Sequence, residues 1–331
     1  MNNEINNLRP KNFEDLNNNA ELKDLGLFLQ SIDQFVHIDC PVCGSKDFKT
    51  LKVNLLEYNL CGLCSVIYMN PQPTEVFLDS FYKNNNTYKF WSEAIFPESE
   101  EYRYQHLCIR RLNLLTDTML ETKGSIPYSI LEVGSGYGTF VKAAQNSDVC
   151  SKIIGIDPNS HLTLNKNSHN SSIIRNTYQN FKSNGDQFDA IVAFEVLEHI
   201  SNPKRFIEFC NKNLRKGGLL MLTTPNTFSL EFYLTNSEWS GFEHEHLILY
   251  NKKSIITLFN KYNYELLEFQ TPGLLDSDLI GEKITNNDFD KKHFLNWSDI
   301  RNSNKNFNKI LQNCINELNI SSHMELILRK N

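Results

Sequence analysis

Long apolar runs are missing from this 331-residue chain, and no stretch approaches the roughly 20 residues that a membrane-spanning helix needs. The N-terminal segment is polar and rich in asparagine, without the apolar core of a secretory signal peptide. We therefore expect a cytoplasmic protein whose thiols stay reduced.

Positive charge is also scarce, because 33 Lys and Arg stand against 39 Asp and Glu, a formal net charge of −6. A broad nucleic-acid-binding surface needs basic patches, so the composition argues against nucleic acid as the main partner. The 40% hydrophobic and 22% charged content is that of a globular chain. The length predicts one large domain with a smaller module.

Cysteine, in contrast, is well represented, and four of the eight residues form two closely spaced pairs. The pattern is Cys-X-X-Cys, a gap of seventeen residues, and a second Cys-X-X-Cys, made by Cys40, Cys43, Cys61 and Cys64. This spacing is typical of a tetrahedral structural zinc site. Four protein ligands leave no open position, so the ion would stabilise a small unit rather than catalyse a reaction. The sequence thus predicts a zinc ribbon over residues 38–73.

Short apolar runs alternate with helical segments from residue 126 onward. The predicted strands are 129–133, 152–156, 173–174, 188–194 and 218–223, and the predicted helices are 139–146, 160–168, 200–214 and 252–260. Buried strands separated by helices indicate a doubly wound parallel sheet, an α/β fold. Residues 263–270 and 324–329 alternate in polarity like a closing antiparallel pair.

These patterns divide the chain into five predicted units. They are an N-terminal segment (1–37), the zinc ribbon (38–73), a helical connector (74–125), a Rossmann-like domain (126–271), and a lid-like insertion with the last strand (272–331).

A glycine-rich turn follows the first predicted strand of the α/β domain. The strand ends at Glu132 and continues as Gly134-Ser135-Gly136-Tyr137-Gly138. Glycine permits positive φ and a close backbone approach, and the helix that follows offers free N–H groups. The next strand ends at Asp157-Pro158, where an acid can hold ribose hydroxyls. A dinucleotide fingerprint would place glycine at Thr139, which argues against a nicotinamide oxidoreductase.

This turn and acid, with the segments 188–200 and 214–218, resemble the class I S-adenosylmethionine-dependent methyltransferases over roughly residues 126–270. The resemblance implies a seven-stranded Rossmann-like sheet and S-adenosylmethionine as cofactor. It also implies that Asp157 binds the ribose and that Pro158 lies near the adenine. The residues implied to surround the methionine part are Glu132, Gly134, Ser135, Gly136 and Gly138.

Two clusters of histidine and carboxylate are expected on the acceptor side of this cofactor. One is Glu195-Val196-Leu197-Glu198-His199, after the strand at 188–194, and the other is Glu243-His244-Glu245-His246. The sulfonium methyl group needs no activation, but an acceptor hydroxyl or carbon acid must lose its proton to a base. Histidine suits that role near neutral pH.

The second cluster resembles the sugar C-methyltransferases, which combine a four-cysteine N-terminal unit with a His-Glu-His run. This resemblance implies His246 as the general base, with Glu245 and His199 orienting the substrate or moving protons. We add Glu195, after the strand at 188–194, to the candidate catalytic residues. The chain departs from that family because Glu243 stands where a tyrosine is expected and because it is too short for the family's full C-terminal domain.

The first cluster resembles two further families. Ubiquinone-pathway O-methyltransferases have a similar Glu-X-X-Glu-His run. Small-RNA 2′-O-methyltransferases use such a run with a later histidine to hold a divalent metal, which implies the ligands Glu195, Glu198, His199 and His246. The run is also compatible with simple capping of the next helix.

We therefore predict methyl transfer to a small acceptor, a hydroxyl or carbon of a sugar or nucleotide-sugar, as in surface polysaccharide biosynthesis. The alternatives are metal-assisted RNA 2′-O-methylation and a zinc-ribbon module that binds nucleic acid.

Overall fold

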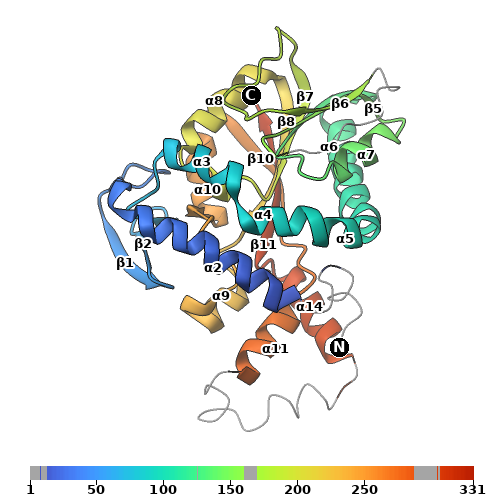
Figure 1. The fold of residues 1–331 in the computed structure, drawn as a ribbon. Coiled ribbons are helices and arrows are strands. Elements are labelled where there is room, and N and C mark those ends of the chain that lie inside the picture. Colours follow the sequence, from blue (N-terminus) through green and yellow to red (C-terminus); the bar gives the residue numbers. More distant parts are fainter. Residues whose placement is uncertain (1–7, 9–12, 125, 160–169, 287–303, 305) are drawn as a thin grey trace.

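The computed structural model describes residues 8, 13–124, 126–159, 170–286, 304 and 306–331, and it contains two sheets joined by helices (Figure 1). The larger sheet has seven strands in the order β10-β11-β8-β7-β4-β5-β6. This confirms the predicted α/β fold class. The strands are β4 (Tyr128–Val133), β5 (Cys150–Asp157), β6 (Ser171–Arg175), β7 (Phe188–Phe194), β8 (Leu214–Pro225), β10 (Tyr264–Gln270) and β11 (His323–Lys330).

Five strands of this sheet are parallel and two are antiparallel. β4 pairs in parallel with β5 and β7, and β11 pairs antiparallel with both β8 and β10. The predicted antiparallel pair at the end of the chain is confirmed. Its order in the sheet was not predicted: β11, with the buried run Met324 to Leu328, lies inside, and the half-exposed β10 forms the edge.

Helices cover both faces of the seven-stranded sheet. One face packs against α6 (Ile109–Lys123) and α7 (Thr139–Gln145), and the other against α8 (Pro203–Asn213) and α10 (Lys252–Asn260). Alternate residues of each strand enter the two cores, as the two-residue period of a strand requires. Three of the four helices predicted for this domain are confirmed, and the fourth, at 160–168, falls outside the described residues.

The smaller sheet combines residues that lie far apart in the sequence. Its antiparallel order is β1 (Phe48–Val53), β2 (Leu56–Cys61), β3 (Ile67–Met69) and β9 (Ile248–Leu249). The first three strands lie in the predicted ribbon, and β9 comes from the predicted Rossmann-like domain. The two units therefore share a sheet and one hydrophobic core.

The helical connector runs across the molecule in Figure 1, from α3 on the side of the small sheet to α5 near α6 and α7. Its helices are α3 (Glu75–Asn84), α4 (Asn86–Phe90) and α5 (Phe96–Arg103), and the N-terminal α2 (Phe13–Ser31) packs against α4. Asp24 of α2 caps α4, because its carboxylate accepts the backbone N–H groups of Asn86 and Thr87 at 3.0 and 2.7 Å.

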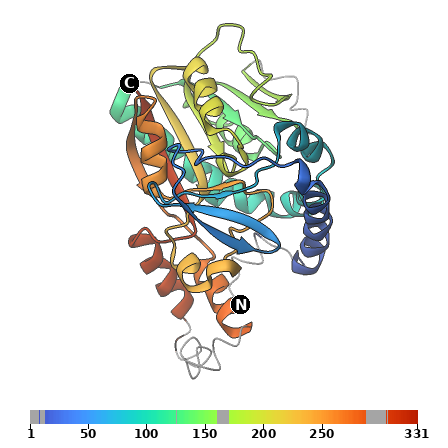
Figure 2. The same cartoon turned by 90° about the vertical axis from the view of Figure 1, so that its left-hand side faces the viewer.

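Three further helices, α9 (Leu230–Thr235), α11 (Asp276–Asn286) and α14 (Phe307–Glu317), lie at the carboxyl ends of the parallel strands (Figures 1 and 2). Among the helices that the structure describes, none is long and apolar enough to cross a membrane.

Candidate functional site

The glycine turn after β4 has the backbone that the sequence predicts. Gly134, Gly136 and Gly138 have φ values of 73°, 49° and 75°, in the region that glycine adopts without strain. A Cβ at Gly134 would also overlap Cγ2 of Val196. The N–H groups of Gly134 and Ser135 donate to the carbonyl of Ile156 at 2.8 and 3.2 Å. The turn is therefore fixed against β5, at the carboxyl edge of the sheet.

Asp157, at the end of β5, is buried and held in one orientation. Its carboxylate accepts the N–H of Gly136 at 2.9 Å and the N–H of Asn159 at 2.8 Å. Tyr88 of α4 also hydrogen bonds to it, and burial together with this carboxylate raises the pKa of the Tyr88 hydroxyl. No local sequence pattern marks Tyr88 as a site residue, because the long-range packing of α4 brings it here. Pro158 follows at an exposed position.

Two buried polar atoms beside the turn are unsatisfied within the described part of the chain: Oε2 of Glu132 and Oγ of Ser135. Glu132 is 4% exposed, and burial together with the charge of Asp157 raises its pKa well above the usual range. A buried carboxyl oxygen without a partner costs free energy that a cationic or N–H donor ligand would recover. These residues therefore fit the amino-acid end of S-adenosylmethionine, with Asp157 placed for its ribose.

On the acceptor side, the short helix η4 (Leu197–His199) follows β7 and brings His199 to His246, with ring centroids 4.9 Å apart. Nδ1 of His199 lies 3.1 Å from the carbonyl of Glu245, and Nδ1 of His246 lies 2.9 Å from the carbonyl of Gly241. A carbonyl only accepts, so each Nδ1 carries a proton, and Nε2 is the nitrogen of each ring that lies free of these carbonyls. Burial and the neighbouring His246 lower the pKa of His199 to about 3, which keeps it neutral.

Glu198 joins these two histidines. It is fully buried, and Oε2 accepts the Thr224 hydroxyl at 2.9 Å, whereas Oε1 has no partner among the residues described. Burial, followed by the charge of Glu195, raises its pKa well above the usual range. Ligand atoms of Glu198, His199 and His246 lie within 4.8 Å of one another. Such a set, one carboxylate and two imidazoles, can hold a divalent cation. The Nδ1–H group of each imidazole is bound to a carbonyl, which orients the ring as a ligand.

Glu195 does not join this group, although the sequence predicted it as a fourth ligand and as an acceptor-side residue. Its φ of 54° turns it away from the helical path of Glu198, and its carboxylate pairs with His323 of β11 at 3.3 Å. Burial opposes the charges of this pair, but their attraction prevails: the pKa of Glu195 falls to about 2 and that of His323 rises to about 9. The side chains are 39% and 55% exposed, so water weakens the pair.

Glu245 contributes to the acceptor side through its backbone. Its carbonyl holds His199, while its side chain lies 3.7 Å from Nε2 of His244, near Asp24. Burial raises the pKa of Glu245 to about 8. The Glu245 carboxylate therefore lies by His244 and Asp24 rather than by His199 or His246. Its role in orienting the substrate stays a prediction.

Tyr82 of α3 is a second residue that the sequence did not single out for this site. Its hydroxyl donates to the carbonyl of His199 at 3.4 Å, and its own carbonyl accepts Nδ2 of Asn159 at 2.9 Å. Since Asn159 also binds Asp157, Tyr82 connects the donor and acceptor sides.

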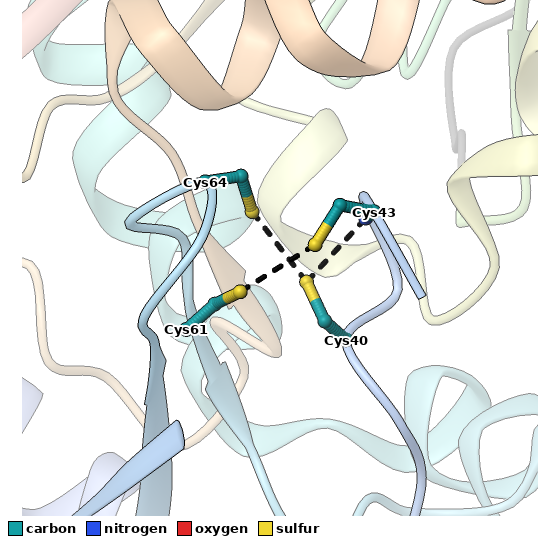
Figure 3. A group of neighbouring side chains, drawn as sticks. All are labelled: Cys40, Cys43, Cys61 and Cys64. Carbon is teal, nitrogen blue, oxygen red and sulfur yellow. Dashed lines mark hydrogen bonds between the residues drawn. The ribbon is translucent and has the colours of Figure 1, made fainter. Parts of the chain in front are cut away.

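The four cysteines predicted to bind zinc converge on one point (Figure 3). Sγ of Cys40 lies 3.5 Å from Sγ of Cys64, and Sγ of Cys43 lies 3.5 Å from Sγ of Cys61. Four sulfurs at the usual Zn–S distance are roughly 3.8 Å apart around a tetrahedral ion. The arrangement is therefore compatible with zinc, and the hydrogen bond with Cys64 lowers the pKa of Cys40 to about 5. The other four cysteines are free thiols outside this cluster.

The ribbon unit (38–73) is bonded directly to the acceptor loop, residues 241–247. The N–H of Met69 donates to the carbonyl of Leu247 at 2.8 Å, and the N–H of Leu247 donates to the carbonyl of Glu198 at 2.8 Å. The Tyr58 hydroxyl donates to the carbonyl of Glu243 at 3.3 Å. The position of His246 thus depends on the ribbon as well as on the large sheet.

Comparison with known proteins agrees with this geometry. The family model described as "Methyltransferase domain" matches residues 100–269, just over half of the chain. The chain belongs to this family and is an S-adenosylmethionine-dependent methyltransferase.

Individual relatives match over shorter lengths. The mitochondrial ubiquinone biosynthesis O-methyltransferase of Dictyostelium discoideum is 29% identical over 150 residues, which cover 40% of this chain and 46% of that protein. The corresponding Psychrobacter arcticus protein is 24% identical over 177 residues, 50% of this chain and 62% of its own. The plantazolicin methyltransferase BpumL, solved with a pentazolic desmethylPZN analog and SAH, is 17% identical and covers 76% of this chain and 94% of its own, with a TM-score of 0.46.

Replacing Glu132 by Gln tests the donor crevice. We expect the affinity for S-adenosylmethionine to fall about 10- to 100-fold, because a charge-assisted hydrogen bond is lost. A cationic amino group favours the ionised form of a carboxyl whose pKa is raised, so binding to the native protein should release protons and tighten as pH rises towards that pKa. Calorimetry in buffers of different ionisation enthalpy measures both effects.

The control for this experiment is Glu208→Gln, at an exposed position on α8. It should leave both the affinity and the proton release unchanged. Native affinity and native proton release in the Glu132 variant would contradict the role of this carboxylate.

Replacing Cys61 by Ser tests the metal site. A structural zinc ion binds with a free energy on the order of 10 kcal/mol, so the variant should lose bound zinc and melt at a markedly lower temperature. Metal analysis of the purified protein and thermal unfolding are the measurements. Cys314→Ser, an exposed thiol on α14, should retain both properties. Equal melting of the two variants would show that the cluster holds no structural metal.

Proposed function

We propose that this methyltransferase transfers the methyl group of S-adenosylmethionine to a hydroxyl oxygen of a small acceptor bound beside His199 and His246. The observation that carries the proposal is the pair of imidazoles whose Nδ1 atoms are each held by a backbone carbonyl, which leaves Nε2 of each ring to face an acceptor at the carboxyl edge of the sheet. Substrates of open α/β sheets bind along this edge.

The acceptor hydroxyl must lose a proton as it reacts. Its oxygen forms a bond to the methyl carbon, the carbon–sulfur bond breaks, and the sulfur keeps the electron pair, which yields S-adenosylhomocysteine. We assign the proton to Nε2 of His246, because Nδ1 is held by Gly241 and Oε2 of Glu243 lies 3.6 Å from Nε2, where it can stabilise the imidazolium. The backbone carbonyl of Glu245 holds the ring of His199, which in turn packs against the ring of His246 and orients it.

A hydroxyl oxygen as the methylated atom is supported by the relatives, which are named O-methyltransferases, and by this base. The sugar or nucleotide-sugar acceptor predicted from the sequence has no counterpart among them, and neither has a role in polysaccharide biosynthesis. RNA as acceptor is not favoured either. We therefore propose a small molecule with a hydroxyl group as the acceptor, without assigning its chemical class at this point. A structural zinc ion at the four cysteines and a cytoplasmic location remain part of the proposal.

A second candidate adds a divalent cation at Glu198, His199 and His246. It is favoured by Oε1 of Glu198, a buried carboxylate oxygen for which the described residues provide no partner. A cation there would lower the pKa of the acceptor hydroxyl. The Thr224 hydroxyl would then orient Glu198, and the carbonyls of Glu245 and Gly241 would orient the two histidines. Glu195 would remain paired with His323.

Replacing His246 by Ala tests the proposal. We expect kcat to fall about 10²- to 10⁴-fold, as for the loss of a general base, while the affinity for S-adenosylhomocysteine stays near that of the native protein. Turnover is measured with labelled donor and a panel of phenols, catechols, sugars and nucleotide-sugars. His37→Ala, at an exposed position, is the control. Native turnover in the His246 variant would exclude it as base.

The cation is tested on the same assay. After chelation and repletion with zinc for the cysteines, turnover that returns only with magnesium or manganese would support the cation site, and Glu198→Gln should then remove that dependence. Full turnover with zinc alone would favour the metal-free base.

A further inference from the structure

A groove of about 590 Å³ lies between the small sheet and α9, outside the groups discussed so far. In Figure 2 the blue β1–β2 hairpin lies directly above the gold helix α9. The volume is in the range of small-molecule sites, which run from roughly 300 to 1,000 Å³. The apolar lining comes from both sides, with Leu51, Leu60 and Ile67 on the sheet and Phe228, Phe232 and Phe242 opposite.

Three polar side chains that line the groove are hydrogen bonded to other parts of the protein. The Thr50 hydroxyl donates to Oδ1 of Asn59, and the Thr227 hydroxyl donates to the carbonyl of Tyr250. Nδ2 of Asn251 donates to the carbonyl of Ser65 at 2.7 Å. The one cation of the lining, Lys52, is an exposed side chain that pairs with Glu57 at 3.3 Å. Hydroxyl-rich or phosphorylated ligands need free donors and charges, and the three bonded groups do not supply them. The groove is therefore chemically suited to an uncharged apolar group.

Phe228 gives the groove an uncovered apolar wall, because its side chain is 71% exposed. Burial of such a ring under an apolar ligand is favourable in proportion to the area removed from water.

Two residues of the lining, Phe228 and Phe242, are close along the chain to residues that hold the acceptor side. Phe228 lies four residues after Thr224, whose hydroxyl holds Glu198. Phe242 lies between Gly241, whose carbonyl holds His246, and Glu243, whose carboxylate is 3.6 Å from that ring. A molecule seated in the groove is thus adjacent in structure to the loop that presents the proposed base.

We propose that this groove binds an apolar alkyl or aryl portion of the acceptor whose hydroxyl is methylated. The proposal rests on the proposed function for the hydroxyl and adds the chemical class of the rest of the molecule. It assigns the ribbon unit a part in choosing the acceptor, since β1, β2 and β3 provide one wall.

The first test uses the neutral fluorescent probe N-phenyl-1-naphthylamine on the full chain. The native protein should bind it, and Phe228→Ser should weaken binding about tenfold. Tyr233→Ser is the matched control, because Tyr233 is a 78% exposed aromatic on α9 that does not line the groove. Absence of binding to the native protein, or equal binding to both variants, would overturn the proposal.

The second test uses para-alkylphenols of increasing chain length with labelled methyl donor. In the native protein and in Tyr233→Ser, KM should fall as the chain lengthens, whereas in Phe228→Ser it should change little, with kcat preserved. A KM independent of chain length in the native protein would contradict the groove. Phenols that displace the probe without being methylated would contradict the proposed function while leaving the groove supported, so the two failures can be told apart.

Discussion

Two backbone hydrogen bonds at Leu247 hold the acceptor side of this methyltransferase together. Its carbonyl accepts from Met69 in the ribbon, and its N–H donates to Glu198 at the end of β7, each at 2.8 Å. Leu247 is fully buried, so these bonds are shielded from water. Since His246 is the preceding residue, the geometry of the proposed base depends on two sheets that are distant in sequence. A change in either sheet is therefore transmitted to the base through main chain rather than through flexible side chains.

The donor side is fixed by local means. The glycine turn is tied to β5 through Ile156, and Asp157 is oriented by two backbone N–H groups. Glu132 is the exception, because one of its oxygens stays unsatisfied in the described structure. The glycine turn and Asp157 are thus rigid, whereas Glu132 is electrostatically incomplete, as the proposed contact with the charged amino group of the cofactor would require. This combination favours binding of a ligand with that charge over a neutral nucleoside.

Features that depend on neighbouring residues could be predicted from the sequence, and those that depend on distant contacts could not. The alternation of strands and helices, the turn at Gly134 and the acid at Asp157 are local patterns with local causes. Tyr88 reaches Asp157 from α4, whose first N–H groups are bound by Asp24 of the distant helix α2. The spacing of Glu195 and Glu198 suggested one ligand set, but a positive φ at Glu195 separates them. The spacing of residues in the sequence predicts neither the positive φ of Glu195 nor its ion pair with His323, which lies on a strand near the end of the chain.

The shared sheet also gives a physical reason for placing a ribbon beside a methyltransferase core. A unit of some 36 residues buries little apolar surface on its own, so a docking surface stabilises it, as the metal proposed at its four cysteines would. Docking through β9 satisfies one edge of β3 and leaves one face of β1 and β2 towards α9. That face and α9 enclose the groove, and Phe242 in its lining belongs to the loop that carries His246. The docking that stabilises the ribbon therefore also forms one wall of the proposed acceptor groove. The large sheet and its own helices do not supply that wall.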